Sequence, residues 1–146
     1  GRPDLALFKF TKAIINDEKI DVYNNGEMYR DFTYIDDLVK SINLLMSNIP
    51  SLGRQTASEI YDAPFRIVNI GNSKKVNLME FIETLEIVLQ KKAKYNFMPL
   101  QMGDVIETHA DSSYLNELIG YVPNTGIKDG IKSFVEWYLD YYKIKP

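Results

Sequence analysis

Arginine and acidic side chains that lie between apolar runs are the residues of this chain best suited to bind an anion. Arg30 is predicted to lie on a strand face between two apolar residues, where a charge needs a partner of opposite sign. A guanidinium can hold two phosphate oxygens at once, so Arg30 is a candidate ligand for a pyrophosphate. The alternative is an ion pair with Asp31 or another carboxylate, and the residues alone leave both open. Arg2 and Asp104 occupy similar loop or strand-edge positions.

Two other candidates for catalysis are better explained by structure. Tyr141 and Lys145 have the Tyr-x-x-x-Lys spacing of a proton-transfer tyrosine with a helper lysine. They lie at the end of the chain among other tyrosines, and we interpret the spacing as a coincidence. His109 has no serine nucleophile motif to serve, so we interpret it as a packed or exposed histidine.

Pairs of neighbouring carboxylates could serve as an acid and a base, and there are three: Asp36–Asp37, Glu83–Glu86 and Asp104–Glu107. Asp36 and Asp37 are predicted to begin a helix, where the helix dipole favours negative charge without any catalytic role. Glu83 and Glu86 are predicted to lie on the solvated face of another helix.

Composition excludes several classes of site. The chain has 146 residues, no cysteine and one histidine, which rules out a disulfide framework, a thiol nucleophile and a multi-histidine metal centre. It contains neither a G-x-G-x-x-G nor a Walker A sequence, so no phosphate-binding glycine loop is recognisable. A formal charge of −3 argues against nucleic-acid binding. No apolar run approaches the roughly 20 residues of a membrane span, and we expect a cytoplasmic protein.

The elements that must position these residues form a mixed α and β pattern in what we expect to be one domain, 1–146. A helix is predicted to begin at Pro3 and end near Asn16, and Asn24-Asn25-Gly26 is a strong turn signal. The segments predicted as strands or extended chain are 20–23, 28–34, 65–70, 95–99 and 121–124. Helices are predicted after Asp36 or Asp37, after Asn77, from Asp111 to Gly120 and after Thr125, with a loop over 48–64.

Several ordered segments resemble one family, the nucleotide-sugar epimerases of the extended short-chain dehydrogenase/reductase group. The segments are Gly1-Arg2-Pro3-Asp4-Leu5-Ala6-Leu7-Phe8, Ile20-Asp21-Val22-Tyr23-Asn24-Asn25-Gly26, Arg30-Asp31-Phe32-Thr33-Tyr34-Ile35-Asp36-Asp37-Leu38, Val68-Asn69-Ile70-Gly71-Asn72, Gln101-Met102-Gly103-Asp104-Val105, Thr108-His109-Ala110-Asp111 and Phe134-Val135-Glu136-Trp137-Tyr138. They extend over essentially the whole chain and are most similar to the UDP-glucuronate 4-epimerases. The resemblance implies a C-terminal substrate-binding lobe, a fragment of a longer chain.

The resemblance also implies a role for particular residues in binding the nucleotide. Asp21, Val22 and Tyr23 match the segment that holds uracil, largely through backbone groups and an aromatic side chain. Arg30 matches the arginine that binds the diphosphate, which favours the ligand interpretation of that residue. Arg2 matches an arginine near the phosphate and sugar end of the substrate.

A second matching stretch departs from the family pattern. Asp104 matches a residue close to the ribose or the adjoining phosphate. Gln101 belongs to the same stretch, at a place where many relatives have an arginine, and Met102 stands where proline is common. His109 stands where relatives often have an aromatic residue, which supports the packing interpretation.

For the intact protein the resemblance implies an NAD-dependent 4-epimerase that acts in capsular or surface polysaccharide synthesis. The sugar is oxidised at C4 by NAD, the 4-keto intermediate rotates, and it is reduced from the other face. The glycine-rich loop and the catalytic Tyr-x-x-x-Lys belong to an upstream Rossmann lobe, so NAD is expected there and not in this chain. We therefore expect the isolated chain to be inactive.

Alternatives within the same superfamily are a UDP-glucuronate decarboxylase and a nucleotide-hexose dehydratase. A non-catalytic interaction module is the alternative from another class. The implied partners are a UDP-sugar and the Rossmann lobe of the same chain, with a homodimer for the full-length protein and neither nucleic acid nor membrane. We also expect the isolated lobe to expose apolar surface through which it can associate.

Overall fold

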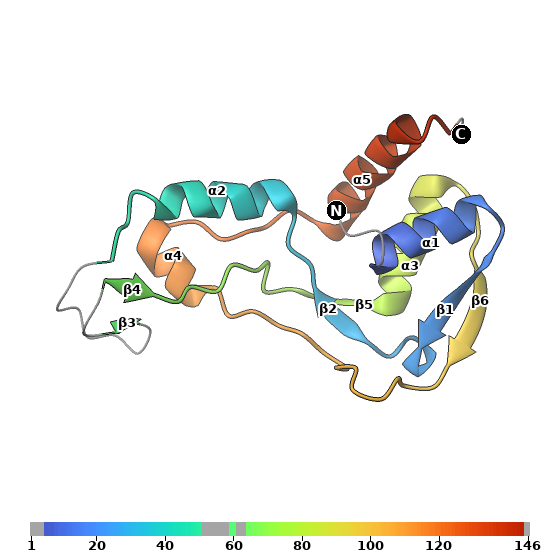
Figure 1. The fold of residues 1–146 in the computed structure, drawn as a ribbon, viewed down its shortest axis with the longest axis horizontal. Helices are drawn as coiled ribbons and strands as arrows, with labels where there is room; N and C mark the ends of the chain where they lie inside the picture. Colours follow the sequence, from blue (N-terminus) through green and yellow to red (C-terminus); the bar gives the residue numbers. More distant parts are fainter. Residues whose placement is uncertain (1–4, 51–58, 61–63, 145–146) are drawn as a thin grey trace. The chain divides into compact units, whose positions relative to one another are not determined.

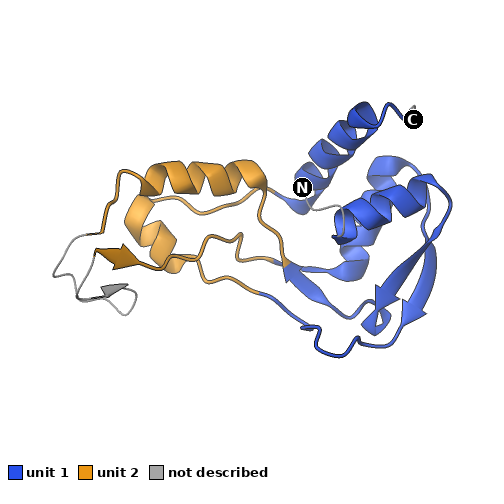
Figure 2. Ribbon diagram, viewed as in Figure 1, with its two compact units in different colours: residues 1–30, 75–108, 126–146 blue, residues 31–74, 109–125 orange. Residues whose placement is uncertain are grey.

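The computed structural model describes residues 5–50, 59–60 and 64–144, in which helices and short strands alternate (Figure 1). The chain divides into two compact units, residues 1–30, 75–108 and 126–146 in unit 1 and residues 31–74 and 109–125 in unit 2 (Figure 2). The mixed α/β class predicted from the sequence is confirmed. The single domain over 1–146 stays a prediction, and Arg2 lies outside the described residues.

Unit 1 is built around a parallel pair of strands, β1 (Lys19–Tyr23) and β6 (Lys94–Met98). The two arrows lie side by side and point the same way in Figure 1, with Lys19 opposite Lys94 and Tyr23 opposite Met98. β1 alternates buried and exposed residues because successive side chains of a strand point to opposite faces. Ile20 and Val22 are therefore in the core.

Three helices complete the core of unit 1: α1 (Ala6–Ile15), which packs on β1, α3 (Leu78–Leu89), which packs on α1, and α5 (Ile127–Tyr141), which packs on α3. Their apolar residues recur at the three- and four-residue spacing that places them on one helix face. The fully or nearly fully buried residues are Phe10, Ile14, Phe81, Ile82, Leu85, Ile131, Val135 and Tyr138. The predicted cap of α3 is confirmed, since the Asn77 side chain accepts the Met79 N–H at 2.8 Å.

A short 3₁₀ turn, Asn24–Gly26, connects β1 to β2 (Tyr29–Asp31), which pairs with β5 (Lys75–Asn77). Gly26 has φ +87°, and a Cβ on it would meet the Met79 side chain at 2.7 Å. Glycine is thus required here both by backbone conformation and by space.

Unit 2 contains α2 (Ile35–Leu45), α4 (Ser113–Ile119) and a small antiparallel pair, β3 (Glu59–Ile60) and β4 (Phe65–Arg66). Hydrogen bonds rather than apolar contacts hold much of it together. The Ser112 hydroxyl accepts the Gly71 N–H at 3.1 Å and donates to the Gly71 carbonyl at 2.8 Å. A Cβ on Gly71 would collide with the Ala110 side chain, so this approach also needs glycine.

Asp37 is the centre of unit 2 and does not cap a helix as predicted. α2 begins at Ile35, and the buried Asp37 carboxylate accepts the Tyr121 hydroxyl at 2.7 Å and the N–H groups of Asn124 and Thr125 at 3.1 and 2.8 Å. Burial alone would raise the pKa of Asp37, but these hydrogen bonds outweigh burial and lower it. The hydrogen bond to Asp37 also raises the pKa of Tyr121 to about 12.

Two other predictions for unit 2 are wrong. Only Phe65–Arg66 of the predicted strand 65–70 is a strand, because among the described residues the rest has no pairing partner. Thr125 does not cap α5, which begins after Gly126.

The prediction that Glu86 lies on a solvated helix face is also wrong. Its side chain is 3% exposed. Its carboxylate accepts hydrogen bonds from Lys92, from the Ala93 N–H and from the Tyr95 hydroxyl at 2.6, 2.9 and 2.7 Å. All three donors follow the end of α3, where Gln90 adopts φ 53° and turns the chain back. Helix periodicity alone contains no information about that reversal.

None of the helices in the described residues is both long and apolar enough to cross a membrane. The same residues contain no group of three acidic or histidine side chains arranged to hold a metal ion.

Candidate functional site

Arg30 is fixed in unit 1 by three acceptors. Its Nη2 atom is 3.2 Å from the Asp104 Oδ1 atom, and its Nη1 atom donates to the carbonyls of Tyr29 at 2.9 Å and Ile106 at 3.1 Å. The Arg30 and Asp104 side chains are 30% and 35% exposed, so the pair is open to solvent. The ion pair proposed as the alternative for Arg30 is therefore present, with Asp104 as the partner.

The segment that carries Asp104 is bound to the strand that carries Arg30. The Tyr29 N–H donates to the Ile106 carbonyl at 2.9 Å, and the Thr108 N–H donates to the Tyr29 carbonyl at 3.1 Å. These bonds form an isolated parallel bridge between Tyr29 and Glu107. The Asp104 to Arg30 contact is consequently set by backbone pairing as well as by charge.

A tight turn orients the Asp104 carboxylate. The Asp104 N–H donates to the Gln101 carbonyl at 3.1 Å, and Asp104 Oδ1 accepts the Val105 N–H at 2.9 Å. Gly103 has φ +85°, a conformation that glycine adopts without strain. The Gln101 and Met102 side chains are exposed on this turn, and Met102 is fully so.

This arrangement leaves part of the guanidinium available. Arg30 has five N–H donors, and the three hydrogen bonds just described use two on Nη1 and one on Nη2. Among the described residues the remaining two, Nε–H and one Nη2–H, have no partner. Two donors on one side of a planar group match the spacing of two oxygens of a phosphate or carboxylate.

The neighbouring carboxylate, Glu107, does not form an acid–base pair with Asp104. Glu107 forms an ion pair with Lys75 of β5, while Asp104 pairs with Arg30. Each carboxylate has its own cation, so neither is placed to share a proton with the other. Sequence patterns contain no signal for the Lys75 partner or for the Ile106 carbonyl, because both contacts depend on pairing between distant segments.

The β1 candidates differ in what they can offer a ligand. The Val22 side chain is fully buried, so Val22 can act only through its backbone. Asp21 accepts a hydrogen bond from the Asn96 side chain at 2.7 Å, and Tyr23 is partly exposed. In a parallel pair, alternate residues direct both N–H and C=O to the neighbouring strand. Among the described residues β1 pairs only with β6, so part of its backbone faces an open edge.

Asp31 and His109 belong to unit 2 and have structural partners. The Asp31 Oδ2 atom accepts the N–H groups of Ser73 and Ala110, both at 3.0 Å, and the His109 Nδ1 atom lies 4.0 Å from it. Asp31 is thus not the ion-pair partner of Arg30. The His109 side chain is nearly half exposed.

Sequence comparison relates this chain to proteins more than twice its length. No protein-family model matches it. It is 51% identical over 148 residues to Protein CapI of Staphylococcus aureus, covering 98% of this chain and 44% of that protein. It is 46% identical over 149 residues to a probable UDP-glucuronate 4-epimerase of Rhizobium meliloti, covering 98% of this chain and again 44% of the relative.

Over nearly its whole length the chain is similar to part of proteins named UDP-glucuronate 4-epimerase. The UDP-glucuronic acid 4-epimerase of Bacillus cereus, solved in complex with UDP-glucuronic acid and NAD, superimposes with a TM-score of 0.78 at 26% identity. That match covers 97% of this chain and 41% of the epimerase chain. The predicted resemblance and its placement in the C-terminal part of these epimerases are confirmed. The chain spans less than half the length of the epimerases it matches.

Proposed function

We propose that this chain is the nucleotide-sugar-binding part of a UDP-hexuronate 4-epimerase. Its similarity to UDP-glucuronate 4-epimerases over nearly all of its residues supports the proposal. The observation that carries it is the Arg30 guanidinium, which is oriented by Asp104 and two carbonyls and keeps two donors available. A preorganised guanidinium can bind the UDP diphosphate without first losing side-chain freedom.

In this proposal Arg30 holds the diphosphate and Asp104 sets its orientation. The ligand and the Asp104 carboxylate then bind the same guanidinium, and Asp104 offsets part of its positive charge. Gln101 lies in the turn that presents Asp104 and is proposed to contact the same end of UDP. Arg2 is proposed to act near the sugar and lies outside the described residues.

The uracil is proposed to lie against Asp21, Val22 and Tyr23. The open edge of β1 supplies backbone N–H and C=O groups, which are suitable partners for the polar edge of the base. The partly exposed Tyr23 ring supplies an aromatic surface for it.

A second surface, on unit 2, is proposed to contact the part of the protein that holds NAD. Helix α2 buries polar residues and exposes apolar ones. Asp37 and Ser41 are buried, whereas four apolar residues are 46–72% exposed: Ile35, Val39, Ile42 and Met46. Their spacing of four, three and four places them on one helix face. Residues 67–70, which have a β-like sequence, also have no strand partner among the described residues.

This chain's own residues do not fit NAD. Its glycines form no G-x-G-x-x-G, and the closely spaced Gly126 and Gly130 open α5 without a preceding strand. We propose that NAD is bound by a lobe outside this chain, as the homology to NAD-containing epimerase structures suggests. The role of this chain is then to hold UDP while the sugar rotates. The homodimer and the cytoplasmic location belong to the same proposal.

The test uses the complete protein that contains this chain, with NAD retained, and UDP-glucuronate as substrate. Replacing Arg30 by Gln removes hydrogen bonds to a charged ligand, each about 1.5–3 kcal/mol. We expect KM for UDP-glucuronate to rise about tenfold or more. Arg30→Lys keeps the charge but not the planar donors and should recover only part of the affinity.

Lys128→Gln is the control, because Lys128 is an exposed cation on α5 that has no ion-pair partner in the part of the chain that the structure describes. Thermal unfolding of each variant separates loss of fold from loss of binding. An unchanged KM in the folded Arg30→Gln protein contradicts the diphosphate role. Carbon dioxide released from UDP-glucuronate would identify a decarboxylase, dehydration of a nucleotide-hexose a dehydratase, and failure to retain NAD a non-catalytic module. This chain alone should show no epimerisation.

A further inference from the structure

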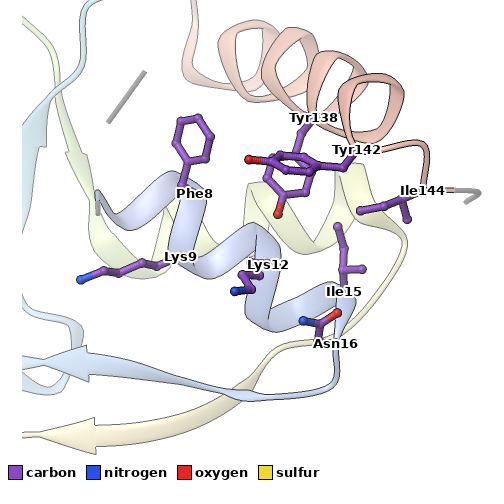
Figure 3. A pocket seen from close by; sticks show the side chains of 8 residues that line it. All are labelled: Phe8, Lys9, Lys12, Ile15, Asn16, Tyr138, Tyr142 and Ile144. Atoms are coloured by element: carbon purple, nitrogen blue, oxygen red, sulfur yellow. The ribbon is translucent and has the colours of Figure 1, made fainter. Parts of the chain in front are cut away.

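An open cavity of about 530 Å³ lies between α1 and the end of α5 in unit 1. It is separate in sequence from the residues proposed to bind UDP. The residues that line it are Phe8, Lys9, Lys12, Ile15, Asn16, Tyr138, Tyr142 and Ile144 (Figure 3). Its volume lies within the range of small-molecule sites, which are mostly apolar with a few polar groups.

The apolar part of the cavity is aromatic and well supported. In Figure 3 the rings of Tyr138, in α5, and of Tyr142, directly after it, extend over α1 near Phe8 and Ile15. The two tyrosine rings are 4.5 Å apart between centroids, and Phe8 packs edge-on against Phe134 at 4.8 Å. Tyr138 is buried, so this wall is fixed by the core of unit 1. A flat apolar group would find ring faces and edges to contact.

The charged part of the cavity is positive only. Lys9 and Lys12 line it, and no carboxylate does. Neither lysine has an ion-pair partner among the described residues. Asp140, in the last turn of α5, is paired with Lys143 at 3.0 Å. Aromatic rings alone could also attract a cation, but two unpaired ammonium groups disfavour one and favour an anion.

We propose that this cavity is a binding site for a small ligand that joins a flat apolar group to an anionic group. The apolar group lies against Phe8, Tyr138 and Tyr142, and the anion meets Lys12 and Lys9. The Asn16 side chain at the rim adds a neutral donor and acceptor. The proposal is independent of the function proposed above, because the two sites share no residue.

The test titrates this chain with three naphthalene compounds of matched shape and follows its NMR signals. 2-Naphthoate is the anion, 2-naphthalenemethanol the neutral analogue and 2-naphthylmethylammonium the cation. We expect shifts confined to α1 and the last turns of α5, in affinity order anion, neutral compound, cation. Trp137 is the only tryptophan, and its ring centroid lies 5.9 Å from that of Phe8, so its indole N–H signal also reports on the cavity. Added salt should weaken the binding of the anionic compound most.

Two variants separate the charge from the rings. Lys12→Gln should weaken naphthoate about two- to fivefold, the range of an exposed ion pair, and leave the neutral compound unchanged. Lys132→Gln is its matched control, since Lys132 is an exposed α5 lysine next to Glu136 and does not line the cavity. Tyr142→Ala removes a half-exposed ring and should weaken the binding of both naphthoate and the neutral compound.

Shifts that map to α2 or scatter over the surface would overturn the proposal, as would equal binding of the cation. Failure of naphthoate to saturate in the millimolar range would overturn it as well. If Tyr142→Ala does not fold, the three compounds and Lys12→Gln still decide the outcome.

Discussion

Glu86 shows how a single side chain can be misjudged from helix periodicity. Its position in α3 suggests solvent, yet the carboxylate is buried against Lys92, the Ala93 N–H and Tyr95. Burial would raise the pKa of Glu86, but these three donors together outweigh burial and lower it. Burial, followed by the bond to Glu86, raises the pKa of Tyr95 to about 12. The cluster fastens the end of α3 to β6.

Replacing Glu86 by Gln should lower the free energy of unfolding by about 1–3 kcal/mol at neutral pH, because a charged acceptor is lost. Since the pKa of Glu86 is lowered from 4.5 in the folded chain, its contribution is present above that value and disappears as pH falls through the folded pKa. Urea unfolding between pH 7 and pH 3 should therefore show the gap between the two proteins closing at low pH.

Glu83→Gln serves as the control, because Glu83 is an exposed carboxylate in the same helix. It should leave stability nearly unchanged across this pH range. A pH-independent gap for Glu86→Gln would show that lost packing, and not the carboxylate charge, accounts for the effect.

Arg30 presents the opposite case, in which sequence reasoning came closer. A charge on an apolar strand face was expected to meet either an anion or a carboxylate, and the structure supplies Asp104 at 3.2 Å. The adjacent Asp31 was a natural candidate partner but lies on the neighbouring position of β2, where side chains alternate in direction. The diphosphate role stays a prediction.

At the scale of elements, α2 is notable because its apolar face is not covered by other described parts of the chain. Its buried side is held by Asp37 and Ser41, and its aliphatic stripe, Ile35, Val39, Ile42 and Met46, faces solvent. The three- and four-residue spacing correctly predicts a helix, but the sequence cannot tell whether the apolar face is covered. An exposed stripe of this kind favours association.

Replacing Ile42 by Lys should reduce self-association of the chain, because it places a charge in the middle of the stripe. The free energy of unfolding should change by less than about 0.5 kcal/mol, since Ile42 is 47% exposed and Lys is a good helix former. Light scattering after size exclusion, over a range of concentrations, measures the association.

The matched control is Asn43→Lys, which adds the same charge at the next, exposed position of α2 outside the stripe. It should leave association largely unchanged. A chain that is strictly monomeric at high concentration before any substitution would contradict the expected role of the stripe.

At the scale of the whole molecule, the two units have different kinds of interior. Among the described residues nearly all buried large apolar side chains belong to unit 1, and unit 2 contributes Leu115 and Pro123. Unit 2 instead buries polar groups, Asp37, Ser41, Asn72 and Ser112, in hydrogen bonds. Hydrogen bonds contribute less net stability than apolar burial of similar extent.

Unit 2 should therefore open before unit 1. Native-state hydrogen exchange should show α2 amides exchanging through a low-energy opening, while α3 amides exchange only near global unfolding. In the complete protein, where the α2 stripe is proposed to be covered, α2 amides should gain protection. Equal exchange free energies for α2 and α3 in this chain would show that the units unfold together.

The sequence by itself determined the mixed α/β class, most helices and the family resemblance. These depend on local signals: apolar spacing, the Asn24-Asn25-Gly26 turn, the Asn77 cap and ordered motifs that extend along the chain. It also singled out Arg30 and Asp104 as charged residues in need of partners.

Only the tertiary structure decided which partners those charges meet. The Arg30 to Asp104 pair and the Asp37 cluster join segments far apart in the chain, and the burial of Glu86 depends on the reversal of the chain after α3. The exposed face of α2 depends on which segments pack against it. The truncated strand at 65–70 has the same origin, because a strand needs a neighbour to supply its hydrogen bonds. Local propensity sets what a segment can form, whereas long-range contacts set which charges and apolar faces are satisfied.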